Sequence, residues 1–594
     1  MALTKGAKKL GVSLLVAGAL VGGYFYAAKN GYVPGEKVAN MIMPKKVDLS
    51  GAAPLSNVKN VALMPFPSTS VNGSGAEYRI DEAAWASQHG LNYANGGAIT
   101  TKGSIMESKG ITNFRIIRQD NFDQQVNDLV AFATEWKKSG GNPKKGVQFI
   151  SLMLDGAPSY MAALKEALTP LNLNPVIIGS VGKSHGEDGL WGPQKWIKDP
   201  KAMKGATVIG VLYDGDMNDP IKLANDNDVR INPDVKTYDP DALNIMAAED
   251  YLKAVDMFRD GYKEEREVVR NGVKTGSKKT IKPDGIVTWT PGDVRIAKEI
   301  GGLYPIVTTE EYYWQMPEAL ITIAEWADAN EAAVENILDA ALTGGAQVKV
   351  HDKALYKACE ISAKIWAGKG EEGKATYWYE NFKRHEIADK KGNKVKVGGS
   401  MNFSIEDAVV AFNLSGADGG PAGSSYTVFG DEMARLWPSK MKSYPAFASV
   451  FNAKYLQAVA KRSNLNEDLT QKPSFDAAPI RETVSTSTKD VQFRVGSAEL
   501  TALGASQVKK LYNEINTTGF KVMITGHADA QGTASQNMAL SQKRAEAVKA
   551  YLISRGFPEN RVNADWKGDT QPVDPAKTPA AYAKNRRVVI ELGK

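Results

Sequence analysis

Short apolar runs alternate with helical stretches through most of the chain. Runs of strand length occur at residues 58–65, 146–154, 175–179, 206–213 and 285–290. Between them, apolar positions recur at helical spacing, as in residues 160–171. Alternation of this kind predicts an α/β fold with mostly parallel sheets. Ligands of such sheets bind at the carboxyl ends of strands, so the loops to examine are residues 68–70, 155–159, 214–219 and 288–293.

The carboxyl-terminal part of the chain has a similar pattern on a smaller scale. We expect strands near 490–495, 520–525, 561–566 and 586–592, with helices near 499–516 and 542–554. In the second helix the apolar positions Ala545, Val548 and Leu552 lie on one face, so Arg544 projects from the polar face. Residues 490–594 are therefore predicted to form a separate α/β domain.

The amino terminus carries a long uncharged segment. Residues 10–28 contain no charged side chain, and as a helix they would span about 28 Å, close to the thickness of a bilayer core. Lys5, Lys8 and Lys9 precede this segment and place the amino terminus in the cytoplasm by the positive-inside rule. We expect a cytoplasmic tail at 1–9, a transmembrane anchor at 10–28 and export of the rest.

A cleaved signal peptide is the alternative for the same segment. Ala17, Gly18 and Ala19 imitate a small-residue cleavage pattern. Cutting there would leave the apolar residues 20–28 at the new terminus, which favours an uncleaved anchor. Gly18 and Gly22 have a spacing that lets two membrane helices approach closely, so a homo-oligomer formed through the anchor is a further expectation.

Composition limits what the rest of the chain can be. A chain of 594 residues is too long for one core and predicts three or four domains. Its net charge of +6 results from 73 basic and 67 acidic residues, a balance that gives no argument for a nucleic-acid partner. The single cysteine, Cys359, excludes an internal disulfide. The five histidines are scattered without ligand spacing, so we expect no metal site and no cofactor.

Two segments have the composition of linkers. Residues 29–55 and 463–489 separate the apolar patterns, and the second is rich in Ser, Thr, Asn, Asp, Lys and Pro. They divide the exported part into a middle domain at 56–462 and a terminal domain at 490–594. A flexible coil of 27 residues has an end-to-end distance of about 30 Å, so we expect both ends of the middle domain to be tethered loosely.

Four motif elements follow one another in the terminal domain. They are Thr-Gly-His-Ala-Asp-Ala-Gln-Gly at 525–532, Asn537, Leu-Ser-Gln-Lys-Arg-Ala at 540–545, and Asn-Arg-Arg-Val-Val-Ile at 585–590. This ordered series resembles the OmpA-like (OmpA/MotB) peptidoglycan-binding domain. The resemblance implies that the chain belongs to the cell envelope and that its partner is peptidoglycan, through the cross-linking amino acid diaminopimelate.

The chemistry of that ligand explains which residues would bind it. Diaminopimelate ends in an ammonium beside a carboxylate, so its receptor needs one acid and one fork-shaped cation. Asp529 would take the ammonium, and the planar guanidinium of Arg544 would grip the carboxylate at two points. In the family, the Asp and Arg at these positions contact the ligand, and Asn537 with one of Arg586 or Arg587 also matches. The alternative is that Asp529 and Arg544 form an ordinary surface ion pair.

The middle domain has a second resemblance. Thr-Trp-Thr-Pro-Gly-Asp at 288–293, the segment 306–317 and the helix at 324–330 look like parts of the type 2 periplasmic substrate-binding proteins of ABC transporters, of the nitrate, sulfonate, taurine or phosphate type. The resemblance implies two α/β lobes that close on a small solute by a hinge motion. It does not imply catalysis, and we expect no enzyme.

Six residues at predicted strand ends are the candidate solute contacts. They are Ser68, Thr69, Ser159, Trp289, Thr290 and Asp293. Hydroxyls, backbone donors and an aromatic wall suit a small polar or anionic solute. Each of these residues also fits a turn or a helix cap, and that reading stays open.

The sequence favours a protein of the inner membrane, with a single membrane pass and its bulk in the periplasm. It would bind peptidoglycan with its last domain and a solute with its middle domain, in ABC-type uptake or sensing. The alternative is a structural or motor-associated tether of the stator B type, whose middle domain is a scaffold. The membrane partner would be an ABC permease in the first case and a motor A-type protein in the second. Stator B proteins usually carry an ionisable Asp in the helix, and residues 10–28 contain none.

Overall fold

The computed structural model describes residues 61–593 apart from 415–418, 464–479, 481–482, 490 and 495. The expected cytoplasmic tail, transmembrane anchor and first linker lie outside the described residues. None of the helices in the described part is long and apolar enough to cross a bilayer.

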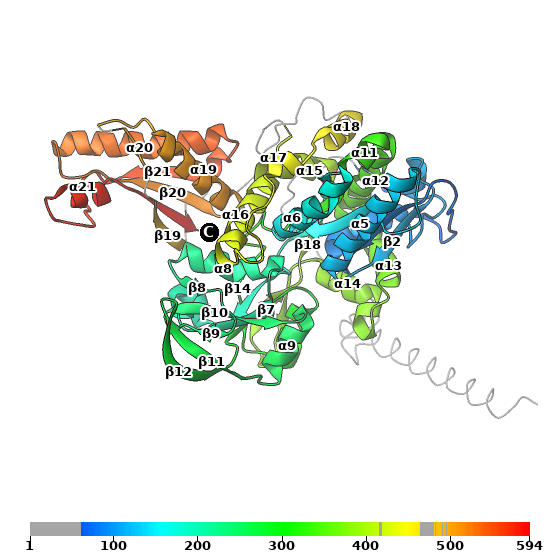
Figure 1. Ribbon diagram of the computed structural model, residues 1–594, viewed down its shortest axis with the longest axis horizontal. Coiled ribbons are helices and arrows are strands. Elements are labelled where there is room, and N and C mark those ends of the chain that lie inside the picture. Colours follow the sequence, from blue (N-terminus) through cyan, green and yellow to red (C-terminus); the bar gives the residue numbers. More distant parts are fainter. Residues whose placement is uncertain are drawn as a thin grey trace, which may run out of the picture. The chain divides into compact units, whose positions relative to one another are not determined.

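The first lobe of the middle domain is built on a five-stranded sheet with the order β2-β1-β3-β15-β4 (Figure 1). Its strands are β1 (Tyr78–Glu82), β2 (Phe114–Arg118), β3 (Phe149–Met153), β4 (Pro175–Gly179) and β15 (Glu318–Ile323). β1 pairs in parallel with β2 and β3, whereas β15 runs antiparallel to β3 and β4. Helices α5 (Phe122–Ser139) and α6 (Ala157–Leu168) pack against β3 and β4, respectively. Every residue of β3 and β4 is buried, which explains why these strands are continuous apolar runs.

The second lobe contains a six-stranded sheet with the order β14-β6-β13-β7-β10-β8 (Figure 1). Its strands are β6 (Gly189–Gly192), β7 (Thr207–Val211), β8 (Arg230–Asn232), β10 (Ala242–Ala248), β13 (Gly285–Thr288) and β14 (Tyr304–Thr308). The pairs β7–β10, β8–β10 and β7–β13 are parallel, and β6 is antiparallel to both of its neighbours. Helices α8 (Asn218–Asp226) and α9 (Tyr251–Arg259) pack against this sheet.

Two of the segments that connect the lobes lie side by side. The first crossing runs from β4 to β6 through β5 (Gly182–Ser184), which pairs with β18 (Ser400–Asn402). The second runs from β14 back to β15. An isolated β-bridge between Lys183 and Pro317 joins the two crossings side by side. The mixed α/β fold with a two-lobed middle domain, expected from the sequence, is thus confirmed.

The terminal domain is a four-stranded sheet with the order β19-β22-β20-β21. The strands are β19 (Thr483–Lys489), β20 (Lys521–Gly526), β21 (Val562–Trp566) and β22 (Val588–Gly593), and the helices are α19 (Ala502–Asn516), α20 (Ala534–Ser554) and α21 (Pro579–Asn585). α20 contacts both β20 and β21. This helix begins eight residues earlier than expected, because Thr533 and Gln536 form a capping box at its start.

Three sequence-based boundaries were wrong. Residues 61–65, the described part of the strand expected at 58–65, belong to no strand, and the first strand is β1. The strand expected near 490–495 is reduced to a single bridge between Phe493 and Leu500. β19 instead lies inside the segment expected to be a linker, so the sheet of the terminal domain begins at Thr483.

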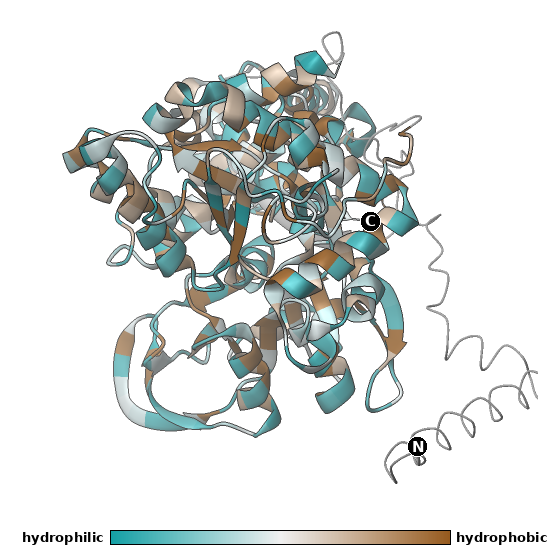
Figure 2. Cartoon of the chain, turned by 90° about the vertical axis from the view of Figure 1, so that its right-hand side faces the viewer, coloured by the Kyte–Doolittle hydropathy of each residue, from teal (hydrophilic) through white to brown (hydrophobic). Residues whose placement is uncertain are grey.

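The terminal domain also packs directly against the middle domain, which differs from the expected loose tether. Trp314 N–H donates a hydrogen bond to Thr517 C=O at 2.9 Å, and Gly519 N–H donates one to Glu311 C=O at 2.8 Å. The rings of Tyr312 and Phe520 meet edge to face, with centroids 6.2 Å apart. Figure 2 shows that many of the described helices carry both hydrophobic and hydrophilic residues, as expected of helices with one buried face. The buried side chains of the second lobe and of the terminal domain form one continuous apolar cluster.

Gly526, at the end of β20, permits the close approach of α20. A Cβ atom at this position would lie 2.2 Å from the backbone oxygen of Ser541. We expect Gly526→Ala to push the helix from the strand and to lower the free energy of unfolding by about 1–3 kcal/mol, as overpacking does. Differential scanning calorimetry of the full chain measures this effect. The control is Gly97→Ala, where the nearest atom would lie 3.4 Å away, and equal stability of both variants would contradict the argument.

Candidate functional site

The loop between β20 and α20 carries Asp529. The capping box at Thr533 fixes the end of this loop, since the Thr533 hydroxyl accepts a hydrogen bond from Gln536 N–H and the Gln536 side chain accepts one from Thr533 N–H. Within the loop, Asp529 Oδ1 accepts a hydrogen bond from Gln531 N–H at 2.9 Å. The Asp529 carboxylate is therefore oriented by its own turn.

The second carboxylate oxygen of Asp529 forms an ion pair with Arg586. Arg586 Nη1 lies 2.6 Å from Asp529 Oδ2, and the side chains of Arg586 and Asp529 are 42% and 8% exposed. The carboxylate is thus enclosed while its cation reaches the solvent. The alternative of a simple ion pair between Asp529 and Arg544 is not what the structure shows, because the partner of Asp529 is Arg586.

Arg544 lies close to this pair but is held separately. Its Nε donates a hydrogen bond to Ser497 C=O at 3.1 Å, and its guanidinium carbon lies 5.1 Å from the centre of the Phe493 ring. Burial lowers the pKa of Arg544, the charge of Arg586 lowers it further, and the charge of Asp529 opposes both effects. Asp529, Arg544 and Arg586 are therefore within electrostatic reach of one another.

Asn537 and Arg587 take different places around the loop. Asn537 is buried in α20 and its side-chain oxygen faces Gly532 of the loop. Arg587 Nη2 donates a hydrogen bond to Gln571 C=O at 3.1 Å, and Arg587 C=O accepts one from His527 N–H at 3.0 Å. Arg587 therefore ties neighbouring segments together. Of the two arginines that the sequence left open, Arg586 is the one that meets Asp529.

The six candidate solute contacts do not form one site. Ser68 and Thr69 are exposed, and Ser68 Oγ accepts a hydrogen bond from Ser70 N–H in a local turn. Ser159 Oγ donates back to Gly156 C=O at 3.1 Å, as in a helix start. The turn reading therefore describes these hydroxyls better than solute contact does.

The other three candidates lie after β13. The Trp289 ring stacks on Tyr251, with centroids 3.7 Å apart. Thr290 is buried beside Asp293. Asp293 Oδ1 and Oδ2 accept hydrogen bonds from Val294 N–H and Gly398 N–H, each at 2.7 Å. Both carboxylate oxygens of Asp293 thus accept a hydrogen bond from the backbone.

The loops at 155–159 and 214–219 do meet, and what they bring together is a set of carboxyl groups. We call Asp155, Asp188, Asp214, Asp216 and Asp219 the interlobe acidic cluster. Asp155 follows β3 of the first lobe, and Asp188 lies on the first crossing between the lobes. The remaining three follow β7 of the second lobe. All five residues are buried. The sequence carried a signal for this cluster, since Asp214, Asp216 and Asp219 fall within six residues, but acids on a loop are normally solvated.

Close contacts join the lobes at this cluster. Asp155 Oδ2 accepts hydrogen bonds from Asn218 Nδ2 at 3.2 Å and from Gln315 Nε2 at 3.3 Å. A Cβ atom on Gly215 would lie 2.5 Å from Asp155 Oδ1, so only a glycine lets the two loops approach this closely. The ends of β3 and β7 therefore face each other at contact distance.

Burial raises the pKa of every carboxyl in the cluster. The pKa of Asp155 rises to about 8, and those of Asp188 and Asp214 rise to about 6. Burial, followed by the charges of neighbouring carboxylates, raises the pKa values of Asp216 and Asp219 well above the usual range. The strongest charges acting on these groups come from other acids rather than from Lys or Arg. The charge of Asp188 acts on Asp216 and raises the pKa of Asp216 further.

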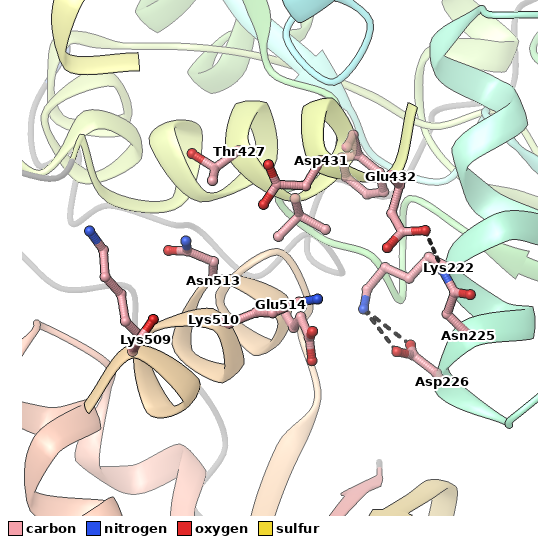
Figure 3. A pocket seen from close by; sticks show the side chains of 13 residues that line it. Lys222, Asn225, Asp226, Thr427, Asp431, Glu432, Lys509, Lys510, Asn513 and Glu514 are labelled. Carbon is pink, nitrogen blue, oxygen red and sulfur yellow. Dashed lines mark hydrogen bonds and ion pairs between the residues drawn. The ribbon is translucent and has the colours of Figure 1, made fainter. Parts of the chain in front are cut away.

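A separate pocket of about 300 Å³ lies between α8, α16 (Gly420–Leu436) and α19 (Figure 3). Its charged residues carry both signs. Lys222 Nζ pairs with Asp226 at 3.1 Å, and Asn225 Nδ2 donates a hydrogen bond to Glu432 at 2.8 Å. Because these charged and polar groups pair with one another, we describe the pocket as part of the contact between the middle and terminal domains.

The raised pKa values make stability depend on pH. Asp155 titrates near 3.8 when unfolded and near 8 when folded, so its stabilising contribution is complete below pH 3.8 and is lost as pH rises towards 8. One such group costs about 1.4 kcal/mol of unfolding free energy for each pH unit in this window. When the pH rises from 6.5 to 8, we expect the free energy of unfolding to fall less for Asp155→Asn than for the unchanged protein.

Denaturation of the full chain by urea at several pH values measures this difference. Burial lowers the pKa values of His89 and His527 to about 3 and 4, from 6.5 in the unfolded chain. Both histidines are therefore largely neutral in folded and unfolded protein at the upper end of the tested pH range. Parallel pH profiles for the variant and the unchanged protein would contradict the assignment.

Comparison with known proteins agrees with the geometry of the terminal domain. Residues 492–586 match the model of the OmpA family. The chain is 44% identical over 71 residues to outer membrane protein A of Bordetella avium, which is 12% of this chain and 37% of that protein. It is also 44% identical over 70 residues to the peptidoglycan-associated lipoprotein of Buchnera aphidicola subsp. Baizongia pistaciae, 12% of this chain and 40% of that protein. The chain thus spans about two fifths of the length of these relatives.

A solved structure similar to the middle domain is the periplasmic nitrate-binding protein NrtA from Synechocystis PCC 6803. The match has 12% identity and a TM-score of 0.44, and it covers 68% of this chain and 92% of that protein. The assignment that the comparisons carry therefore concerns the end of the chain, where residues 492–586 form a domain of the OmpA family.

Proposed function

We propose that this protein belongs to the cell envelope, where its terminal domain binds peptidoglycan and its middle domain acts as a receptor for a small solute. The observation that carries the first part is that an enclosed carboxylate, Asp529, and a separate guanidinium, Arg544, lie within electrostatic reach of each other at the matching positions of an OmpA-family domain. Relatives of this domain include a protein named peptidoglycan-associated lipoprotein.

The geometry suits the ammonium and carboxylate at the end of diaminopimelate. Arg544 donates to Ser497 C=O through Nε, and its two terminal nitrogens would donate to the ligand carboxylate. Asp529 would accept from the ligand ammonium. Its present partner, Arg586, is nearly half exposed, so replacing or sharing this ion pair costs little free energy.

The proposal for the middle domain is a binding role and not catalysis. The two lobes meet at two adjacent crossings, which is the arrangement that lets domains close by a hinge. Polar groups converge where β3 and β7 end, at the edge of each sheet where ligands bind in α/β proteins. An anchor at residues 10–28 would hold this receptor at the inner membrane, facing the periplasm.

A tether between membrane and wall is the second candidate function. The observation that favours it is the continuous apolar cluster shared by the second lobe and the terminal domain. Such a contact passes force from the wall-binding domain to the rest of the chain without a flexible joint. In this case the middle domain serves as a scaffold, beside a motor A-type membrane protein.

We expect Asp529→Ala and Arg544→Ala each to reduce binding to purified peptidoglycan at least tenfold, because each removes a charged hydrogen bond. Sedimentation of the full chain with insoluble peptidoglycan measures the bound fraction. Arg544→Lys, which keeps the charge but loses the planar fork, is expected to lose most of the binding as well.

The matched control is Lys543→Ala, since Lys543 is an exposed cation on the same helix, next to Arg544. This variant is expected to bind as the unchanged protein does. Retained binding by both Asp529→Ala and Arg544→Ala, with the thermal unfolding midpoint unchanged, would show that the wall contact lies elsewhere.

A further inference from the structure

The interlobe acidic cluster consists of acidic side chains. It combines carboxyl groups from both lobes and from a crossing segment, and all five residues are at most 6% exposed. Among the described residues, both carboxyl oxygens of Asp216 and of Asp219 lack a hydrogen-bond partner, as do Asp155 Oδ1 and Asp188 Oδ2. Buried acceptors in this number carry a high cost unless a donor reaches them.

A neutral side chain gives independent evidence of a missing donor. Gln315 lies on the second crossing, is fully buried, and faces the cluster through its contact with Asp155. Its backbone is fixed, since its N–H donates to Tyr312 C=O and its C=O accepts from the Ser425 hydroxyl. Its side-chain oxygen, however, finds no hydrogen-bond donor in the described part of the chain. This acceptor belongs to the same buried amide whose nitrogen contacts Asp155, so it adds a further demand for a donor beside the cluster.

Three cations on or beside α8 and the first crossing have other partners. Lys222, on the same helix as Asp219, pairs with Asp226. Arg384 pairs with Glu310 at 2.6 Å. Lys183 is buried, with Nζ 3.7 Å from the centre of the Tyr313 ring and 3.0 Å from Ser184 C=O. None of these three supplies the interlobe acidic cluster with a counter-charge.

We propose that the solute bound between the lobes is an organic cation carrying primary or secondary ammonium groups, which donate hydrogen bonds to Asp216, Asp219 and Gln315. This inference rests on the receptor function proposed above and names its ligand class. It replaces the expected anionic solute, which five buried carboxyls would repel. Asp155 of the first lobe and Asp219 of the second lobe would contact the same ligand.

A metal ion suits the cluster less well. A metal site gathers several oxygen ligands around one point. In the described part of the chain no group of three or more acidic, histidine or cysteine side chains has such an arrangement. The carboxyls instead follow three separate segments, which suits a ligand that extends beyond one atom and carries N–H donors.

The test is calorimetric titration of the full chain at pH 7.5 with spermidine and 1,4-diaminobutane. Choline is the control cation, because its quaternary nitrogen has no N–H donor. Nitrate, taurine and phosphate form the anionic arm, and calcium chloride forms the metal arm. We expect saturable binding of at least one amine, with choline at least tenfold weaker.

Two variants and a matched control locate the binding. Asp219→Asn and Asp216→Asn should each weaken amine binding at least tenfold while raising the unfolding midpoint of the free protein, because each removes an unpaired buried carboxyl. Asp81→Asn is the control, since Asp81 is 1% exposed and has a pKa raised to about 8, but it lies beside Asp128 of α5. This control should also stabilise the free protein and leave amine binding unchanged.

Each outcome decides the matter. Binding of an anion and of no amine would overturn the inference while supporting the receptor function. Binding of calcium without any amine would overturn the ligand class and assign the cluster to a metal. Failure of every probe would count against the inference and also against the receptor function. Amine binding that is equally strong in Asp219→Asn and Asp216→Asn would place the ligand outside the cluster.

Discussion

The mutual repulsion of buried carboxyl groups is the constraint on which the middle domain depends. The two lobes meet at Asp155 and Gly215, and this contact brings five acids out of water into one place. Such a contact is stable only if the acids hold protons or receive a cation. Under the proposed receptor function, the charge of this interface would set the balance between open and closed protein.

The terminal domain handles charge in the opposite way. The charge of Asp529 is balanced by its ion pair with Arg586. Backbone contacts position two side chains: Gln531 N–H orients Asp529, and Ser497 C=O holds Arg544. The close approach of α20 to β20 at Gly526 sets the distance between the loop and the helix. Contact between this domain and the second lobe, through Trp314, Tyr312 and the apolar cluster, joins the two binding regions in one body.

The sequence predicted the elements whose burial is visible as an apolar pattern. β3, β4 and β7 were predicted correctly because their residues are buried on both faces. β19 was missed because Thr483–Lys489 is a run of Thr and Ser at the edge of its sheet, with no alternation to mark one face. The strand expected at 58–65 was wrong for its described residues 61–65, since an apolar run without a pairing partner forms no strand.

The sites were predicted unequally for a related reason. Asp529 and Arg544 belong to an ordered motif, so their neighbourhood could be inferred, whereas the choice of Arg586 over Arg587 depends on which way each side chain leaves the segment before β22. The sequence correctly predicted that loops 155–159 and 214–219 lie at strand ends. It did not predict which of their residues form the interlobe acidic cluster, because that depends on burial between the lobes. That burial is a property of the tertiary contact and leaves no periodicity in the sequence.

Small-angle X-ray scattering of the full chain at pH 6 and pH 8.5 tests the coupling of charge to closure most directly. The account predicts a larger radius of gyration at pH 8.5 in the absence of solute, because the deprotonated carboxyls repel one another across the lobes. It further predicts that Asp155→Asn suppresses most of this expansion. An identical radius at both pH values, or an expansion that the substitution leaves unchanged, would contradict it.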